Sequence, residues 1–387
     1  MPLAAWLPAL PWAVPFLSLL RLADKRPDLA RAEPVRGRPL SVIVPARNEA
    51  AVIGNVVRSI LGGGYDPLEL IVVDDRSEDG TAGVVRAIAA DDARVRLVEG
   101  AALPADWYGK PWACAQGAAI ATGRLLLFTD ADTTHHPGLH ARAVALQEEL
   151  DADLLTLAPR QRCVTFWERL VMPQIWVLLG VRFHPRVVNR ARRRRDLIAN
   201  GQFLLIRREA YDAIGGHAMV RDEVAEDLAL AQAFHAAGRR VRFAFAERHM
   251  ETRMYHSLRH LAEGWTKNLY LGGRRSYPDE PVLRALVPAG LATAIGFWLL
   301  PTLGLALAGA GIAPALLGPA LRAWAVSAGF WAVISAHMRI PPWYGLLHPL
   351  GAGMALAIVA RSTLRGGRRV EWKGRVYGER GAGTGRP

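Results

Sequence analysis

The feature that most constrains this chain is a long uncharged run near its carboxyl end. No charged side chain occurs in the 37 residues between Arg284 and Arg322, and two further apolar runs follow. About 20 apolar residues suffice to cross a bilayer as a helix. The alternative is a buried helical core, but no helix of a soluble core needs 37 uncharged residues. We therefore predict a block of transmembrane helices at 284–361. Its three helices are expected near 286–309, near 316–337 and, shorter, near 344–361.

A second apolar stretch lies at the amino end. Residues 1–20 carry no charged side chain, and Arg21, Lys25 and Arg26 follow them. No basic residue precedes the run, as it would in a cleaved signal peptide, so we expect an N-terminal transmembrane anchor. The positive-inside rule places the domain after it in the cytoplasm. The protein is thus expected to be a multi-pass protein of the cell membrane.

The tail at 362–387 is also basic, and the same rule favours the cytoplasmic side for it. Three full crossings from a cytoplasmic domain would deliver this tail to the opposite side. The proline-interrupted run at 340–360 is the weakest of the three. We expect it to re-enter the membrane or lie in the interface, so that the tail returns beside the catalytic domain.

Between the two apolar regions, short apolar runs alternate with segments of helical periodicity. Strands are expected at 40–44, 70–73, 95–98 and 125–128. Helices are expected at 52–61, 81–90 and 111–121. This alternation predicts an α/β fold with a mostly parallel sheet flanked by helices. Ligands of such sheets bind at the carboxyl ends of the strands.

Those strand ends carry acids. Asp130 and Asp132 follow an apolar strand and repel each other unless a cation lies between them. A divalent ion that itself chelates a diphosphate would satisfy both. Asp132 and Asp79 could instead be ordinary helix N-caps. No GxGxxG or GxxxxGK[ST] motif follows any strand, which excludes the dinucleotide and P-loop classes.

The charge and cysteine content exclude other classes. Two cysteines are too few for a disulfide framework or a thiolate metal site. The net charge is +13, but 44 of the 48 basic residues are arginine, a skew that codon usage can produce. We therefore predict no nucleic-acid partner. Against this background an isolated lysine such as Lys110 suggests a need for a compact ammonium, although a neutral surface role remains open.

Four motifs in this order resemble the family 2 glycosyltransferases. They are Ser41-Val-Ile-Val-Pro-Ala-Arg-Asn-Glu49, Ile71-Val-Val-Asp-Asp-Arg-Ser-Glu-Asp-Gly-Thr81, Asp130-Ala-Asp132, and Gly215-Gly216-His217 with Glu226-Asp227. The resemblance covers about 40–270 and implies a GT-A catalytic domain, which we place at 38–275. The flanking membrane helices resemble the branch that glycosylates lipids and isoprenoids, including ceramide, hopanoid-associated and carotenoid glycosyltransferases. Val370-Glu-Trp-Lys-Gly-Arg375 also resembles a segment of that branch.

The resemblance implies a role for each matching residue. The nucleotide-sugar donor, UDP- or GDP-linked, would be bound by Pro45, Arg47, Glu49, Asp74, Asp75, Lys110, Asp130, Gly215 and Gly216. Asp130 and Asp132 would hold Mn²⁺ or Mg²⁺ on the leaving diphosphate. Asp227, beside Glu226, would be the base that deprotonates the acceptor hydroxyl during an in-line, inverting transfer. Read without the family, the two acids could simply favour a helix N-terminus, and the two glycines could form a turn.

One departure from the family pattern bears on the product. The Gln-x-x-Arg-Trp motif of processive members reads Leu261-Ala-Glu-Gly-Trp265 here, and only the tryptophan matches. Transfer of one sugar to a carotenoid, hopanoid, sphingolipid or polyprenyl acceptor is therefore favoured over polymer synthesis. Trp265 is expected near the sugar or acceptor, and Lys267 near the diphosphate. A processive polysaccharide synthase and a catalytically inactive membrane assembly protein remain the alternatives.

A last segment, 166–195, joins an apolar stretch to a basic cluster. Seven arginines lie between Arg182 and Arg195, with no acid among them. This pattern favours an interfacial helix on anionic headgroups, with a solvated basic loop as the alternative.

Overall fold

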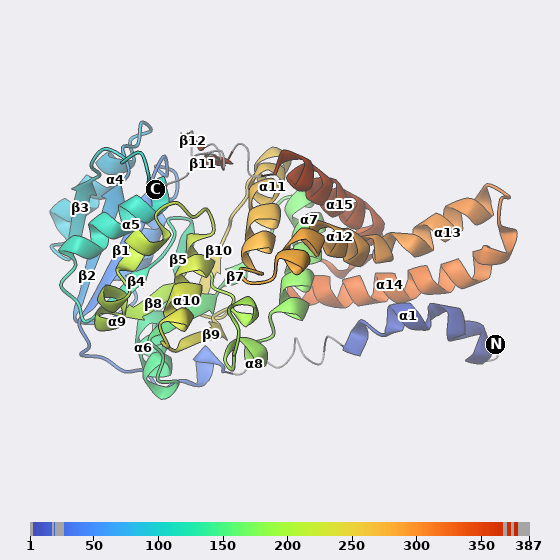
Figure 1. Cartoon of the computed structure of the whole chain (residues 1–387), viewed down its shortest axis with the longest axis horizontal. Helices are drawn as coiled ribbons and strands as arrows, with labels where there is room; N and C mark the ends of the chain where they lie inside the picture. The colour runs from blue at the N-terminus through green and yellow to red at the C-terminus, as the bar shows by residue number, and fades with distance from the viewer. Residues whose placement is uncertain (1–2, 18, 20–26, 367–369, 373–374, 378–387) are drawn as a thin grey trace, which may run out of the picture.

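The structure, a computed structural model, describes residues 3–17, 19, 27–366, 370–372 and 375–377. Figure 1 shows an α/β domain at one end of the molecule and long helices projecting from the other. The helices α13 (Leu300–Gly309) and α14 (Leu317–His337) form the part of this projection that lies furthest from the sheet.

The centre of the α/β domain is a seven-stranded sheet in the order β3-β2-β1-β4-β8-β6-β9. Its strands are β1 (Leu40–Ala46), β2 (Leu68–Asp74), β3 (Val95–Glu99), β4 (Leu125–Phe128), β6 (Leu154–Ala158), β8 (Leu204–Arg207) and β9 (Val241–Phe245). Strands β1 to β4 are parallel, whereas β8 runs antiparallel to both β4 and β6. The prediction of a mostly parallel sheet is confirmed, and the direction of β8 is its exception.

Two smaller sheets complete the strands. One has the order β5-β10-β7 and the other pairs β11 with β12. Their strands are β5 (Thr133–His135), β7 (Arg160–Gln161), β10 (Met250–Thr252), β11 (Val370–Trp372) and β12 (Arg375–Tyr377).

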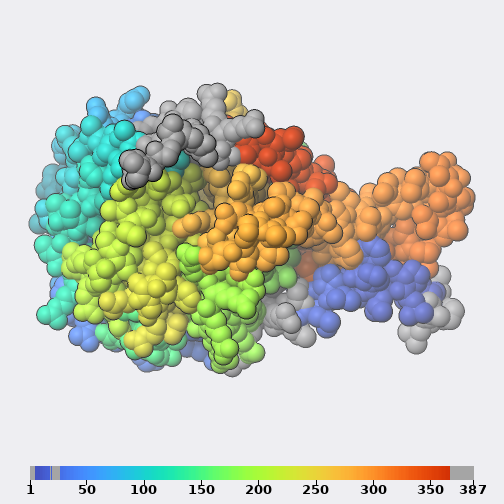
Figure 2. Space-filling model, in the orientation of Figure 1, coloured from blue at the N-terminus to red at the C-terminus, as the bar shows by residue number. Residues whose placement is uncertain are grey.

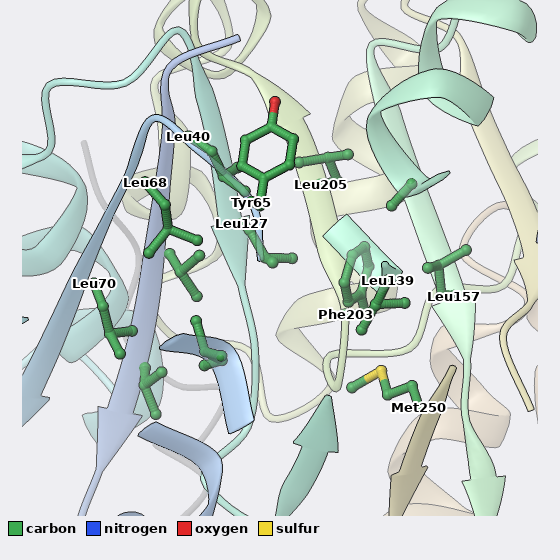
Figure 3. Packing of buried hydrophobic residues seen from close by; sticks show 14 of the residues in the cluster. Leu40, Tyr65, Leu68, Leu70, Leu127, Leu139, Leu157, Phe203, Leu205 and Met250 are labelled. Atoms are coloured by element: carbon green, nitrogen blue, oxygen red, sulfur yellow. The ribbon is translucent and has the colours of Figure 1, made fainter. Parts of the chain in front are cut away.

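Helices cover both faces of the large sheet. They are α3 (Ile53–Leu61), α4 (Thr81–Asp91), α5 (Gly109–Ile120), α6 (Leu139–Glu149), α9 (Arg208–Ala213) and α10 (Glu226–Ala236). Alternate residues of β1 face opposite sides: Val42 and Val44 join the core beneath α3 and α6, and Ile43 joins the core beneath α5 and α10. Figure 3 shows the first of these cores. Burial on both faces explains why the strands read as continuous apolar runs.

The remaining helices form the projecting part and its base. They are α7 (Phe166–Arg182), α11 (Leu258–Arg275), α12 (Pro281–Gly296), α13 (Leu300–Gly309), α14 (Leu317–His337) and α15 (His348–Arg365). The short helix α8 (Pro185–Val188) instead packs on β9 of the large sheet. Short 3-10 turns are η1 (Leu3–Ala9), η2 (Leu29–Arg31), η3 (Arg194–Asp196), η4 (Gly216–Val220), η5 (Phe297–Leu299), η6 (Pro314–Leu316) and η7 (Pro342–Leu347).

Three helical stretches of the described chain are long and apolar enough to cross a membrane. They are Pro281–Gly309, Pro314–His337 and Pro342–Arg365. The first two agree closely with the predicted helices. The third has 24 residues, as many as the second. It is longer than the predicted helix at both ends, because η7 begins at Pro342 and α15 continues to Arg365.

The third stretch nevertheless begins and ends beside the α/β domain. After α14 the chain reverses, and η7 packs on α14 so closely that a Cβ on Gly345 would lie 2.6 Å from the carbonyl oxygen of Ala328. The ring of His348 then lies 5.9 Å from that of Trp324, about 20 Å along α14 from His337. From there α15 returns, and near its end Ser362 donates a hydrogen bond to the carbonyl of Thr266 in α11.

The helix α7 is enclosed by protein. Its residues Leu170, Val171 and Ile175 belong to a core shared with α11 and α15. Arg194 and Arg195, in the basic cluster, form ion pairs with Asp279 and Glu280. The apolar residues expected to face lipid are therefore mostly covered by helices. The arginines that stay exposed are Arg186, Arg190, Arg192 and Arg193.

The amino-terminal segment consists of η1 and α1 (Leu10–Ala13) and lies along α14. Trp12 stacks on Phe297 with ring centroids 5.1 Å apart, and Phe16 meets the edge of Phe330 at 5.4 Å. Figure 2 shows this segment, in blue, against the projecting helices. It is not among the three candidate spans of the described residues, because it is divided into short helices. The charged residues at 21–26 and most of the tail lie outside the described residues.

Candidate active site

A cavity of ≈ 1260 Å³ opens at the edge of the sheet where β1 and β4 end. Its polar end is lined by Pro45, Arg47, Glu49, Lys110, Asp130, Asp132, Gly201, Glu226 and Asp227. These residues come from five different segments of the chain. The sequence predicted that the residues after the strands at 40–44 and 125–128 lie at one edge of the sheet. The cavity brings them together with Glu226 and Asp227.

The ammonium of Lys110 links two of these acids. Its Nζ lies 2.8 Å from Oδ1 of Asp130 and 2.6 Å from Oε1 of Glu226. Burial on its own lowers the pKa of Lys110, but the carboxylates of Asp130 and Glu226 outweigh burial and hold this pKa well above its usual value. Lys110 is therefore a permanent cation between Asp130, which follows β4, and Glu226, which begins α10.

Asp227 occupies a different electrostatic environment. Its Oδ2 accepts a hydrogen bond from the backbone N–H of Gly201 at 2.8 Å, and its Oδ1 accepts one from Leu228 at 2.7 Å. Burial raises the pKa of Asp227 to about 6, and the neighbouring Glu226 carboxylate acts in the same direction. A carboxylate with this pKa is ionised at pH 7 and still takes up a proton readily, as a general base must.

Gly201 forms the floor of this group of charges. A Cβ at this position would lie 2.8 Å from Nζ of Lys110 and 3.3 Å from Oδ2 of Asp227. The register pairs Phe128 with Leu204, so the residues just before β8 lie beside those just after β4. The antiparallel direction of β8 thus brings Gly201 to the functional edge.

The loop that carries Asp130 and Asp132 is braced from below by histidines. The hydroxyl of Thr129 donates a hydrogen bond to the backbone carbonyl oxygen of Gln202, and the hydroxyl of Thr133 donates one to the backbone carbonyl oxygen of Asp130. Nε2 of His135 lies 3.1 Å and 3.2 Å from these two hydroxyls and so donates to them, while its Nδ1 accepts from His140. Burial lowers the pKa of His135 well below its usual value, so the ring is neutral at pH 7.

The loops expected to bind the nucleoside are tied to each other. Arg47 donates from Nη1 to the carbonyl oxygens of Asp75 and Arg76 at 2.7 and 2.8 Å. Asp74 accepts from the N–H of Ser77 at 3.2 Å. Asp74 and Asp75 are both buried, and neither is among the described residues that line the cavity. Their position is behind the loop rather than in its open face.

Gly215 and Gly216 also lie away from the cavity lining. Both have positive φ, 81° and 57°, and a Cβ on Gly216 would come within 2.5 Å of the Tyr211 ring. The turn before η4 accounts for both glycines without any contact to a sugar. His217 follows, buried and bonded to the Tyr211 hydroxyl.

The other end of the cavity is apolar and reaches the projecting helices. It is lined from α7, α11, α12 and α14 by Ile175, Leu178, Trp265, Leu269, Leu283, Leu286, Leu291, Ile334 and Met338. Trp265 is mostly buried and lies edge-on to Trp176 at 6.4 Å. Lys267 lies on the same wall, and burial lowers its pKa despite the nearby Glu226. One cavity therefore joins a charged end to an apolar end.

Comparisons with known proteins agree with this geometry. Residues 41–228 match the model of the family described as glycosyl transferase family 2. These residues form a family 2 glycosyltransferase domain. A 4,4'-diaponeurosporenoate glycosyltransferase of Staphylococcus aureus strain MRSA252 is 29% identical over 356 residues, which cover 88% of either chain. The enzyme of the same description from strain USA300 is 28% identical over 353 residues, with the same coverage.

The fold of the glycosyltransferase domain is GT-A. A mannosyltransferase from Pyrobaculum calidifontis, solved in complex with GDP-Man and Mn²⁺, superposes with a TM-score of 0.51. That alignment covers 94% of this chain and 96% of the other, at 18% sequence identity. Together with the three apolar helices, these matches make the chain a membrane-associated glycosyltransferase.

The acids of the glycosyltransferase domain suit a shared rather than a self-sufficient metal site. Within the part of the chain that the structure describes, no group of three or more His, Cys, Asp or Glu side chains could hold an ion. Asp130 and Asp132 supply carboxylate oxygens on the cavity wall, which suit Mg²⁺ or Mn²⁺. Such ions commonly take only one or two carboxylates from the protein and the rest from phosphates. The donor set therefore fits an ion bound together with a diphosphate.

Proposed function

We propose that this glycosyltransferase moves one sugar from a UDP- or GDP-linked donor to a lipid or isoprenoid acceptor, such as a carotenoid, at the membrane surface. The observation that carries the proposal is the single cavity with a charged end and an apolar end. A nucleotide sugar requires the first, and a membrane-embedded acceptor requires the second. The acceptors named for the Staphylococcus aureus relatives support an isoprenoid.

In the proposed reaction the acceptor oxygen attacks the anomeric carbon while Asp227 takes its proton. The bond from this carbon to the diphosphate breaks, the diphosphate leaves with the electron pair, and the configuration inverts. Gly201 and Leu228 hold the Asp227 carboxylate in place through their N–H groups. A divalent ion held by Asp130 and Asp132 would supply positive charge to the leaving diphosphate, as the Mn²⁺ of the Pyrobaculum calidifontis structure suggests.

The donor loops contribute by position. Arg47 and Glu49 line the cavity at the end of β1, where a nucleoside would lie. Asp74 and Asp75 support this loop through the carbonyl that Arg47 binds and the N–H of Ser77. Their proposed role is to shape the nucleoside site from behind. Trp265 and Lys267 lie where the charged and apolar ends meet, beside the proposed acceptor and diphosphate.

A carboxylate acceptor is the second candidate. The relatives are named for diaponeurosporenoate, which is a carboxylate. A carboxylate attacks without losing a proton, so it needs no base. The raised pKa of Asp227 favours a hydroxyl acceptor, for which a base is required. The two candidates differ in their response to Asp227→Asn, which abolishes transfer to a hydroxyl and spares transfer to a carboxylate.

The purified protein in detergent provides the test. Release of UDP or GDP from a panel of sugar nucleotides is measured with Mn²⁺ or with EDTA, and with an isoprenoid alcohol, an isoprenoid carboxylic acid or no acceptor. We expect nucleotide release that requires one acceptor, and one glycosylated product per acceptor. A ladder of products would instead support the processive alternative. No release with any pair would support an inactive assembly protein.

We further propose that the catalytic domain is cytoplasmic and that Pro342–Arg365 re-enters the membrane without crossing it. Met338, at the end of α14, and Trp265 of α11 both line the catalytic cavity. The end of α15 contacts α11 through Ser362, which supports the proposal that both ends of the third apolar stretch lie on the catalytic side. The amino-terminal segment beside α14 then supplies the remaining crossing.

Single cysteines test this topology in a background without Cys114 and Cys163. Leu364 is 86% exposed at the end of α15, and Ile312 is 73% exposed between α13 and α14. A membrane-impermeant maleimide added to intact cells should label Ile312→Cys and leave Leu364→Cys unlabelled until the cells are permeabilised. Labelling of Leu364→Cys from outside would show that the third stretch crosses.

A further inference from the structure

The position of Lys110 is unfavourable for its own helix. It is the second residue of α5, whose first turn contains no acid. A cation at a helix N-terminus is opposed by the helix dipole, so local helix stability does not explain a lysine there. The side chain instead reaches across the cavity to Asp130 and Glu226. Its location is explained by this contact.

The contact with Asp130 conflicts with a metal ion on the same carboxylate. Nζ lies 2.8 Å from Oδ1 of Asp130. A Mg²⁺ ion would lie about 2.1 Å from a carboxylate oxygen. The ammonium and the metal ion would then share one carboxylate, and their positive charges would repel each other. The ammonium therefore opposes a metal ion on Asp130 for as long as it stays there.

A diphosphate removes this conflict. Its oxygens accept hydrogen bonds from an ammonium and coordinate a divalent ion at the same time. The four-carbon stem of a lysine is flexible, and the Lys110 side chain is 22% exposed on the cavity wall, so its ammonium can move. Glu226 remains beside it as a second partner at 2.6 Å.

We propose that Lys110 is a built-in counter-ion that keeps a divalent metal off Asp130 until the donor diphosphate arrives and takes over its ammonium. This inference rests on the proposed metal site at Asp130 and Asp132, and it adds the condition under which a metal ion binds there. Metal alone binds weakly, and metal and nucleotide bind as a pair. Lys110 is thus a positioning residue for the metal as well as a ligand of the diphosphate.

The experiment measures Mn²⁺ binding by the loss of the EPR signal of free Mn²⁺, without any turnover. Lys110→Met removes the ammonium and keeps a chain of similar length. Without nucleotide, this variant should bind Mn²⁺ about ten- to hundredfold more tightly than the wild type, the range expected for release of a charged hydrogen bond. In the wild type, UDP or GDP should tighten Mn²⁺ binding, and in Lys110→Met this coupling should shrink.

Three controls separate the contact from its surroundings. Lys267→Met removes a nearby positive charge that, among the described residues, forms no ion pair with Asp130, and its effect should be clearly smaller. Equal tightening in both lysine variants would overturn the inference, since net charge alone would then explain the result. Adding Asp130→Asn to Lys110→Met should abolish the tightening. Lys110→Gln, which keeps a hydrogen-bond donor near the buried acids, repeats the measurement if the methionine variant does not fold.

The outcomes also distinguish this inference from the proposed function. Unchanged Mn²⁺ affinity in Lys110→Met, with strong binding in the wild type, overturns the inference and leaves the metal site in place. Failure of every variant to bind Mn²⁺, even with UDP or GDP, overturns both.

Discussion

Replacing Asp227 by asparagine should separate the chemistry of transfer from donor binding. The substitution keeps the size of the side chain and removes its ability to accept a proton. Loss of general-base catalysis typically lowers a rate by about 10²–10⁴-fold. Asparagine retains one oxygen acceptor for the two N–H groups of Gly201 and Leu228, so one of these bonds is lost. We expect about 1–3 kcal/mol of destabilisation from the unpaired donor, which thermal unfolding will register.

The pH dependence of the wild type provides a second measurement of the same residue. Because the pKa of Asp227 is raised to about 6, its protonated fraction grows as the pH falls through 6. Transfer to a hydroxyl should therefore decline below pH 6, approaching about tenfold per pH unit, whereas an ordinary carboxylate would hold activity down to about pH 4. Asp227→Asn should lose this acidic limb along with most of its activity.

The assay compares kcat with the binding of UDP and GDP measured by calorimetry. Asp222, an exposed acid five residues earlier, offers a matched control, and Asp222→Asn should leave both unchanged. Loss of nucleotide binding together with activity would refute the role of Asp227 as a base and place it in the donor site. Retention of full kcat on a hydroxyl acceptor would refute it as well.

Three further predictions concern the metal, the cavity floor and the re-entrant turn. Asp132→Ala should lower transfer by at least about two orders of magnitude, as should EDTA on the wild type, because the charge on the leaving diphosphate is no longer offset. Full activity of the folded variant in EDTA would contradict the metal assignment. Gly201→Ala places a methyl 2.8 Å from Nζ of Lys110 and should lower kcat/KM about ten- to hundredfold. The control Gly83→Ala, whose methyl meets open space, should leave kcat/KM unchanged. Equal activities of the two variants would contradict the contact. Gly345→Ala drives a Cβ to 2.5 Å from the backbone of α14 and should lower the thermal unfolding temperature in detergent, with Gly353→Ala as the control in open space.

The sequence predicted the half of the site that depends on parallel strands. Runs such as Leu125–Phe128 are apolar because both faces are buried, and the residues after them necessarily meet at one edge. Gly201 was missed because β8 is antiparallel, so the residues before this strand, and not those after it, lie at the cavity. No local pattern in the sequence reveals the direction of a strand. The only available signal was Asn200-Gly201 before an apolar run. His135 was missed because its ring bonds to two neutral hydroxyls and another histidine, which leaves no charge pattern in the sequence.

The membrane part shows a different limit of sequence reasoning. Hydropathy identified the helices because lipid and protein interiors both exclude charge. It could not distinguish these two surroundings, and so it assigned the apolar residues of α7 to lipid although Leu170 and Ile175 pack on helices. The length of Pro342–Arg365 likewise permits a crossing. Its reversal along α14 and the contact of its last turn with α11 argue for a return to the catalytic side.

The apolar end of the cavity has a consequence for the asymmetry of the bilayer. It is lined by α7, α11, α12 and α14 close to the catalytic domain. In the proposed reaction, an acceptor would therefore enter and its glycosylated product would leave through one leaflet only. With the proposed cytoplasmic location of the domain, each turnover would add a sugar headgroup to the inner leaflet. A sugar headgroup does not cross hydrocarbon unaided, so the product accumulates on that side. Its presence in the outer leaflet of a cell would therefore require a separate transbilayer carrier.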